Sequence, residues 1–141
     1  SAEMFRVVSR LCVPYILTST KPTLREMLLE FAEKVQQLRD LGQKDIVLDP
    51  GFGFGKTQEQ NYEVLRQLER LQVMELPVLA GLSRKSMIWH LLGTTPDEAL
   101  NGTTVLNTLA LQKGAAILRV HDVREAVECI KLMKACFSHS D

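Results

Sequence analysis

The residues best suited to chemistry follow three short apolar runs, at the points where those runs end. Asp49 ends the first run, and Lys85 follows the second by a few residues. Arg119 and His121 end the third, and their alternation along an extended chain points both to one face. Ligands of parallel sheets bind at the carboxyl ends of the strands. A carboxylate and several cations at these ends therefore predict a site for a polar, partly anionic small molecule.

The glycine-rich segment 49–56 invites comparison with nucleotide-binding loops, but its spacing excludes them. A P-loop requires glycine where this chain has Pro50. The dinucleotide pattern G-x-G-x-x-G places its third glycine at Lys56 when started at Gly51, and at Gln58 when started at Gly53. We therefore interpret these glycines as positions that need unusual φ values in a strand-to-helix connection.

Each polar segment also has a structural interpretation that involves no ligand. For 83–86, with two hydroxyls and two cations, this is a serine N-cap followed by solvated basic neighbours. Phe54 either walls a pocket or packs on a helix. A lone histidine is more often structural, but an arginine two residues before His121 favours anion binding. Asp122 is expected to cap the last helix.

The elements that must position these residues alternate between strand and helix. The pattern predicts strands at 13–17, 45–48, 77–80 and 116–120, and helices at 3–11, 24–41, 60–71, 86–92, 96–112 and 123–137. Strands joined by single crossover helices form a parallel sheet. We therefore expect four parallel, adjacent, sequential strands, with the polar residues converging at one end.

Composition limits the possible classes of protein. The 141 residues suit one domain, and 17 basic residues balance 17 acidic ones, so no nucleic-acid surface is indicated. No apolar run approaches the ~18 residues of a membrane span, and no secretion signal opens the chain. Cys12, Cys129 and Cys136 lack zinc spacing and are expected to be reduced thiols. The expected location is the cytoplasm.

Three motifs together resemble the C-terminal half of dihydropteroate synthase. They are DPGFGFGK at 49–56, SRKS at 83–86 and RVHDV at 119–123, in the order and spacing of that family. The resemblance runs from about residue 1 to 137. It implies an α/β fold in which residues 1–141 form strands five to eight, with their helices, of a pterin-binding (β/α)8 barrel. Because such a barrel needs ~250 residues, a piece of a longer protein is the simpler interpretation.

The resemblance also implies a reaction and a role for each candidate residue. The family joins 7,8-dihydropterin-6-ylmethyl diphosphate to p-aminobenzoate, giving 7,8-dihydropteroate and pyrophosphate for folate biosynthesis. No covalent nucleophile is required, and Mg²⁺ is implied without identifiable ligands in this chain. The implied contacts are Asp49, Phe54, Gly81, Lys85 and Arg119 for the pterin; Arg119 and His121 for pyrophosphate; and Ser83, Arg84 and Ser86 for the vicinity of p-aminobenzoate. Arg84 is expected at the mouth of the site, shielding it.

The chain departs from the family pattern after its first strand. Thr18 occupies the place of a methionine that lines the family's pterin pocket, and the loop that follows, 18–23, is short. The family's N-terminal half, with the groups that bind the other edge of the pterin, has no counterpart here. We therefore expect the chain alone to be inactive.

Two alternatives remain open at this stage. The chain could be a folded, inactive piece or degenerate paralogue that only self-associates, or a methyltransferase-type pterin-binding domain, which the Arg119–His121 pair disfavours. A homo-oligomer is expected in either case, because open strand edges and apolar inner faces favour association. The inner-face residues, or their neighbours, are Ile16, Val47, Val78 and Leu118.

Overall fold

A computed structural model of the chain describes residues 4–5 and 13–138. Most of the helix expected at 3–11 lies outside the described residues, as do Cys12 and His139. Met4 and Phe5 are helical, and Phe5 is buried with its ring edge-on to Tyr15 at 5.4 Å between centroids. Cys129 and Cys136 are both free thiols.

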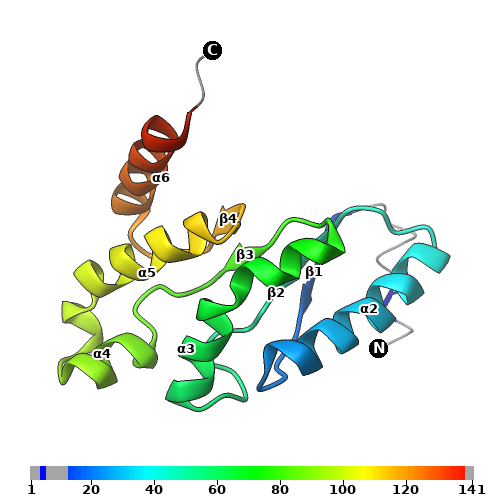
Figure 1. The fold of residues 1–141 in the computed structure, drawn as a ribbon, viewed down its shortest axis with the longest axis horizontal. Coiled ribbons are helices and arrows are strands. Elements are labelled where there is room, and N and C mark those ends of the chain that lie inside the picture. The colour runs from blue at the N-terminus through cyan, green and yellow to red at the C-terminus, as the bar shows by residue number, and fades with distance from the viewer. Residues whose placement is uncertain (1–3, 6–12, 139–141) are drawn as a thin grey trace.

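Strands and helices alternate along the described chain (Figure 1). In order, the elements are β1 (Tyr15–Thr18), α2 (Leu24–Asp40), β2 (Ile46–Asp49), α3 (Gln58–Arg66), the 3₁₀ helix η1 (Leu68–Met74), β3 (Leu79–Ala80), α4 (Ser86–Leu92), the 3₁₀ helix η2 (Pro96–Glu98), α5 (Leu100–Gln112), β4 (Ile117–Leu118) and α6 (Val123–Phe137). No helix of this part of the chain is long and apolar enough to cross a membrane.

The strands pair in parallel and in sequence order. β1 pairs with β2 and β3 with β4, while a single parallel bridge between Leu48 and Val78 joins the two pairs. The backbone N–H of Leu48 donates to the carbonyl of Pro77 at 2.8 Å across the same junction. Every pairing in the described region is therefore parallel, which confirms the predicted order, although β3 and β4 are only two residues long.

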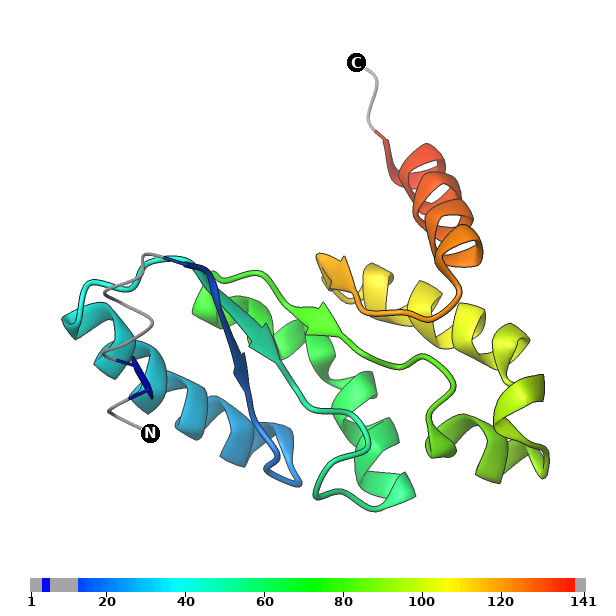
Figure 2. The same cartoon turned by 180° about the vertical axis from the view of Figure 1, so that it is seen from behind.

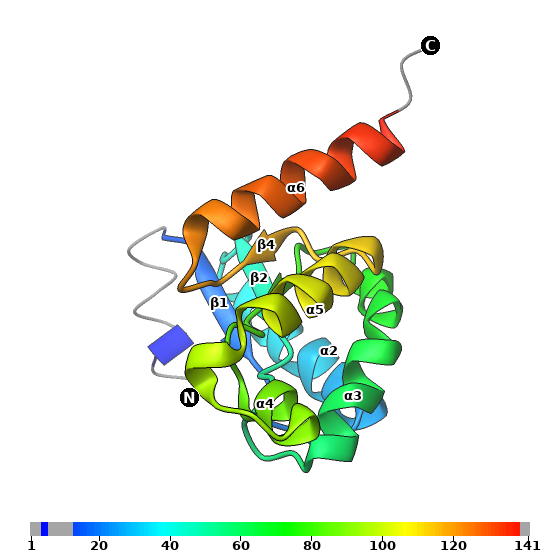
Figure 3. The ribbon, with the colours of Figure 1, turned by 90° about the vertical axis from the view of Figure 1, so that its left-hand side faces the viewer.

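Helices α2 and α3 lie on one side of the strands, and in the view from behind no described element covers the opposite side of β1 and β2 (Figure 2). Viewed from the side, α2, α3 and α5 lie to one side of β1 and β2, while α6 packs on α5 and extends beyond it (Figure 3). Ile16 on β1 is 49% exposed, as expected for an inner face without a partner. Val78, expected to be exposed, is fully buried, because it is bridged to Leu48 and its side chain therefore lies with that of Leu48 on the core face of the strands.

Helix α2 shows why periodicity predicted the helices well. The Thr23 side chain caps it by accepting a hydrogen bond from the backbone N–H of Glu26, and Gly42 follows its end with a φ of 91°. Its buried side chains recur at helical spacing and face the strands; they are Leu24, Met27, Phe31, Val35 and Leu38.

Two helices differ from their expected ranges. The helix predicted at 60–71 begins earlier, at Gln58, because Thr57 and Gln60 form a capping box. It then gives way to η1, whose three-residue turn buries both Leu68 and Leu71 on one face. The helix predicted at 96–112 divides into η2 and α5 at Ala99.

Candidate active site

Asp49 is the buried centre of the candidate site. Asp49 is the last residue of the apolar strand β2, at the carboxyl end of the row of strands, and it is 2% exposed. Oδ1 accepts a hydrogen bond from the backbone N–H of Gly51 at 2.9 Å. Oδ2 accepts from Arg119 Nη2 at 3.2 Å and from Thr18 Oγ1 at 3.3 Å. A buried carboxylate requires such partners, and the expectation that Asp49 has them is confirmed.

Arg119 reaches Asp49 across the surface of Gly81. Its backbone N–H donates to the carbonyl of Ala80 at 3.1 Å, which continues the β3–β4 ladder and aims the side chain back over the sheet. A Cβ on Gly81 would lie 2.8 Å from Arg119 Nη2. Glycine at 81 therefore makes room for the guanidinium, a requirement that the sequence did not reveal. The side chain is half-exposed, so one face of the guanidinium remains open to a ligand.

Lys85 joins the loop after β3 to the glycine-rich loop after β2. Its Nζ donates to the carbonyl of Phe52 at 3.0 Å and lies 4.6 Å from the centroid of the Phe54 ring. Burial and the neighbouring positive charge of Arg119 lower the pKa of Lys85, with Asp49 opposing them. Phe54 is 52% exposed, so its ring covers Lys85 while remaining open on the other side.

The glycine-rich loop has the backbone that its sequence predicted. Gly51, Gly53 and Gly55 all have positive φ, of 62°, 88° and 66°. Gly51 packs so tightly that an added Cβ would lie 2.4 Å from the carbonyl oxygen of Ser19. The loop is thus fixed against the segment that follows β1, and the interpretation as a strained connection is confirmed.

Sequence reasoning missed two residues that hold this loop. Lys56 Nζ donates to the carbonyls of Gly51 at 2.9 Å and Phe54 at 3.1 Å, and burial lowers its pKa, with Asp49 opposing and Lys85 adding to the effect. Asn61 Oδ1 accepts from the N–H of Gly53 at 2.8 Å. For Asn61, the available signal was a polar residue on the otherwise apolar inner side of α3.

Ser83 and His121 form a second polar contact, between the loops after β3 and β4. Ser83 Oγ lies 2.8 Å from His121 Nδ1 and accepts from the His121 backbone N–H at 3.2 Å. Which of Ser83 Oγ and His121 Nδ1 donates depends on the tautomer of the imidazole ring. The N-cap interpretation of Ser83 is wrong: the N-cap of α4 is Lys85, and no side chain caps this helix.

Arg84 is not a solvated residue at the mouth of the site. Its Nε and Nη2 donate to Asp122 Oδ2 and Oδ1 at 2.9 and 3.1 Å. Its Nη1 donates to the carbonyls of Pro96 at 2.7 Å and Asp97 at 2.9 Å. Asp122 is the N-cap residue of α6, as expected, but its side chain is engaged with Arg84 and makes no capping hydrogen bond. Ser86, by contrast, is exposed at the first position of α4.

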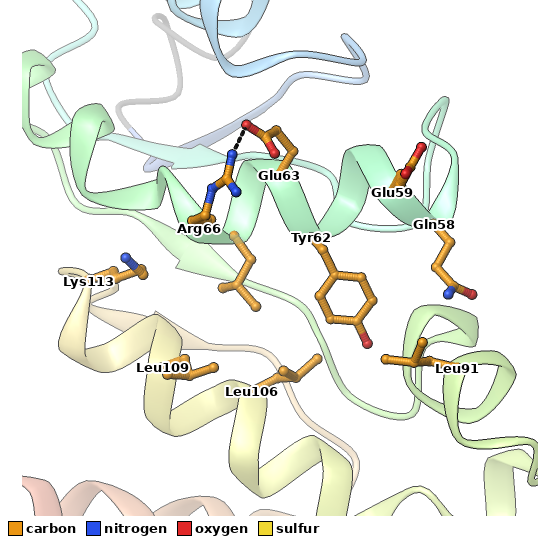
Figure 4. Close-up of a pocket in the computed structure, with 10 residues that line it drawn as sticks. Gln58, Glu59, Tyr62, Glu63, Arg66, Leu91, Leu106, Leu109 and Lys113 are labelled. Carbon is orange, nitrogen blue, oxygen red and sulfur yellow. Dashed lines mark hydrogen bonds and ion pairs between the residues drawn. The ribbon is translucent and has the colours of Figure 1, made fainter.

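One hollow of the described surface, smaller than the one of about 920 Å³ beside α6, lies away from these residues. It measures about 550 Å³ and is lined by α3, α4 and α5, with Tyr62 and Leu106 on facing sides (Figure 4). Tyr62 donates from its hydroxyl to the carbonyl of Met87 at 2.6 Å. The lining of this hollow is mainly apolar and includes neither Asp49 nor Arg119. We assign the site to the strand ends, because converging charged groups indicate chemistry better than depth alone.

The described residues do not fit a magnesium site. No group of three or more His, Cys, Asp or Glu side chains in this part of the chain could hold a metal ion. Asp49, the carboxylate at the strand ends, already accepts three hydrogen bonds. Thus we derive no step that passes through Mg²⁺.

Comparison with known proteins agrees with this fold. Residues 2–121 match the family of pterin binding enzymes, and the chain belongs to that family. It resembles dihydropteroate synthases from Escherichia coli (42% identity over 110 residues) and Clostridium beijerinckii (37% over 139). These alignments cover 77% and 92% of this chain, but 39% and 52% of the relatives, so the chain spans about half the length of the curated relatives it matches.

Solved structures give the same result. A Clostridium difficile dihydropteroate synthase crystallised in the presence of pteroic acid superposes with a TM-score of 0.92 at 32% identity, over 97% of this chain and 56% of that one. The Yersinia pestis enzyme gives 0.91 at 32% identity, over 96% and 59%. The described strands and helices are therefore part of a β/α barrel of the dihydropteroate synthase type.

Proposed function

We propose that this chain supplies the part of a dihydropteroate synthase that holds the pterin diphosphate during its condensation with p-aminobenzoate. The observation that best supports the proposal is the convergence of Asp49, Lys85 and Arg119 from three different strand ends. Their sequence motifs and the family match point to the same ligand.

Asp49 and Lys85 suit opposite hydrogen-bonding needs of a pterin ring. The Asp49 carboxylate accepts from ring N–H groups, and an incoming pterin would share or displace the Thr18 and Arg119 contacts on Oδ2. Lys85 Nζ, exchanging its bond to the Phe52 carbonyl, donates to the ring carbonyl and nitrogen. The half-exposed Arg119 guanidinium provides a flat cationic surface on which the ring can stack.

Arg119 and His121 suit the leaving group. As the bond between the methylene carbon and the diphosphate oxygen breaks, negative charge grows on pyrophosphate and positive charge on the pterin methylene. Cationic donors fixed beside the departing oxygen stabilise that charge. The amine of p-aminobenzoate then attacks the methylene and loses a proton. Three residues were assigned to the vicinity of p-aminobenzoate. Ser86 is exposed, while Ser83 and Arg84 contact the loop after β4.

The 141-residue chain alone is proposed to be inactive and to self-associate in the cytoplasm. Half of the pocket is absent, and Ile16 on the edge strand β1 is widely exposed. A methyltransferase-type pterin-binding domain is less well supported, because in such a domain no anion leaves that Arg119 and His121 could bind.

The test is an assay of dihydropteroate formation with the chain alone, and with the chain co-expressed with the N-terminal half of the E. coli synthase. We expect no product in the first case and product in the second, lost in Lys85→Ala. Turnover by the chain alone, lost in Lys85→Ala, would refute the proposed inactivity. Failure of the chain to bind 6-hydroxymethylpterin in fluorescence titration, together with no product on co-expression, would refute the function.

A further inference from the structure

Two neighbouring pairs connect the loop after β3 to the loop after β4. Ser83 contacts His121, and Arg84 contacts Asp122, so the same separation of 38 residues is bridged twice in succession. Both Arg84–Asp122 bonds are within normal hydrogen-bond distance, and the two side chains are only 24% and 22% exposed. The guanidinium thus forms a two-bond fork on the carboxylate, a geometry that fixes orientation as well as distance.

The guanidinium is also fixed on its other edge. Nη1 donates to the carbonyls of Pro96 and Asp97, which belong to η2. The backbone N–H of Arg84 donates to Thr103 Oγ1 on α5 at 2.9 Å, and the Arg84 carbonyl accepts from Trp89 Nε1 on α4 at 3.2 Å. Arg84 therefore ties four segments together around one residue.

The backbone of Arg84 supports a role in geometry. Its φ is 53°, in the left-handed region that side chains other than glycine rarely adopt. This conformation reverses the chain between Ser83, which faces the β4 loop, and Lys85, which faces the glycine-rich loop. A strained backbone persists only where surrounding contacts over-determine it, and the Arg84 contacts supply that determination.

We propose that Arg84 and Asp122 are positioning residues, which lock the two loops together and thereby set Lys85 and His121 at the separation that the pterin and its diphosphate require. The proposal rests on the proposed function. It replaces the expected role of Arg84 at the mouth of the site and that of the Asp122 side chain as a helix cap. Neither side chain needs to touch a substrate.

NMR titration of the isolated chain tests this without any ligand. The readouts are the titration of the Lys85 ammonium, which burial, Arg119 and Asp49 influence, and the ring ¹⁵N shifts of His121. In Arg84→Met and in the milder, isosteric Asp122→Asn, we expect the pKa of Lys85 to rise toward its ordinary value and the His121 Nδ1 signal to change. Arg66→Met, which removes an exposed arginine paired with Glu63, is the matched control and should change neither.

A double variant shows whether the pair acts as a unit. Arg84→Met with Asp122→Asn should do no more than Arg84→Met alone, because the arginine change already removes the contact with Asp122 as well as the two carbonyl bonds. Arg84→Lys should not rescue the signals, since an ammonium cannot form the fork and the two carbonyl bonds together. Unchanged Lys85 and His121 signals in a destabilised Asp122→Asn chain, or fully additive effects, would refute the positioning role.

Binding measurements separate this proposal from the proposed function. Affinity for 6-hydroxymethylpterin should fall about tenfold in Asp122→Asn, as for loss of one charge-assisted hydrogen bond. If the unmodified chain does not bind 6-hydroxymethylpterin, the proposed function loses support, while the NMR titration still decides whether Arg84 and Asp122 set Lys85 and His121.

Discussion

Asp49 and Arg119 lie 70 residues apart in the sequence and form an ion pair, with 3.2 Å between Oδ2 and Nη2. The carboxylate is buried at the end of β2, while the guanidinium is half-exposed beyond β4. The pair therefore spans the intervening strand end, at β3, and gives the open sheet a polar centre at its carboxyl edge. A ligand that binds at this edge can contact both the buried carboxylate acceptor of Asp49 and the half-exposed cation of Arg119.

Asp49→Asn should abolish most pterin binding while the chain remains folded. The amide oxygen still accepts from the Gly51 N–H, but the charge that holds ring N–H groups and Arg119 is lost. Hydrogen bonds to charged groups contribute about 1.5–3 kcal/mol, so affinity for 6-hydroxymethylpterin should fall roughly tenfold to a hundredfold. Fluorescence titration measures it, with the exposed Asp45→Asn as control; equal affinity in both variants would contradict the assigned role.

Thr18→Met should strengthen pterin binding. The Thr18 hydroxyl occupies Asp49 Oδ2, where it competes with ring N–H donors, and a methionine removes this competitor and enlarges the apolar wall. Loss of one competing hydrogen bond to the carboxylate corresponds to about 1.5 kcal/mol, or roughly tenfold in affinity. Thr20→Met, two residues further along, is the control. Weaker binding in Thr18→Met would mean that the hydroxyl itself contacts the ligand.

Much of this site could be predicted from the sequence, because strand ends are fixed by local pattern. The alternation of apolar runs and helices placed Asp49, Lys85, Arg119 and His121 at one edge. The structure brings Asp49, Lys85 and Arg119 together there, while His121 contacts Ser83. The direction of Arg84 could not be predicted, since its positive φ depends on contacts with Asp122 and η2 that are distant in sequence.

The same distinction explains the errors in the elements. The apolar face of α2 follows from the local sequence, and the range of this helix was predicted nearly to its ends. Val78 was expected on an open face, but its burial depends on its bridge to Leu48 of β2. Ser83 resembles an N-cap in sequence, yet its hydroxyl is bound by His121, 38 residues away.

Stability should rise with pH in the alkaline range because of Lys85. The pKa of Lys85 in the folded chain lies below its ordinary value of 10.5, so between those two values the unfolded chain binds more protons and the free energy of unfolding increases with pH. Lys85→Met should remove part of this rise and stabilise the chain most below the window. Urea unfolding from pH 8 to 10 measures it, and the measurement stops there because Tyr62, whose pKa is raised by burial, opposes the rise above its ordinary 10.0. A steeper rise in Lys85→Met would contradict the assignment.

The chain should self-associate at micromolar concentration through its open strand edge. Ile16 is 49% exposed on β1, which has one neighbour in the described sheet. A lysine on an edge strand opposes pairing with another chain, so Ile16→Lys should reduce the mass measured by sedimentation. Leu29→Lys, on the exposed face of α2, is the control. A monomeric unmodified chain would show that this edge is not an interface.

Gly81→Ala should disturb the site more than the fold, through Arg119. The added methyl would lie 2.8 Å from Nη2 and 3.2 Å from Nε of Arg119, and these atoms belong to a flexible side chain that can move away. Moving it breaks the bond to Asp49, so 6-hydroxymethylpterin affinity should fall about tenfold, with only a small loss in the free energy of unfolding. In an Arg119→Ala background the same change meets no guanidinium and should have no further effect on either quantity. Gly51→Ala provides the contrast, because its methyl would meet the backbone carbonyl of Ser19 at a φ of 62° and should destabilise the fold by about 1–3 kcal/mol. Equal losses of binding from Gly81→Ala with and without Arg119 would show that glycine at 81 serves the ligand directly.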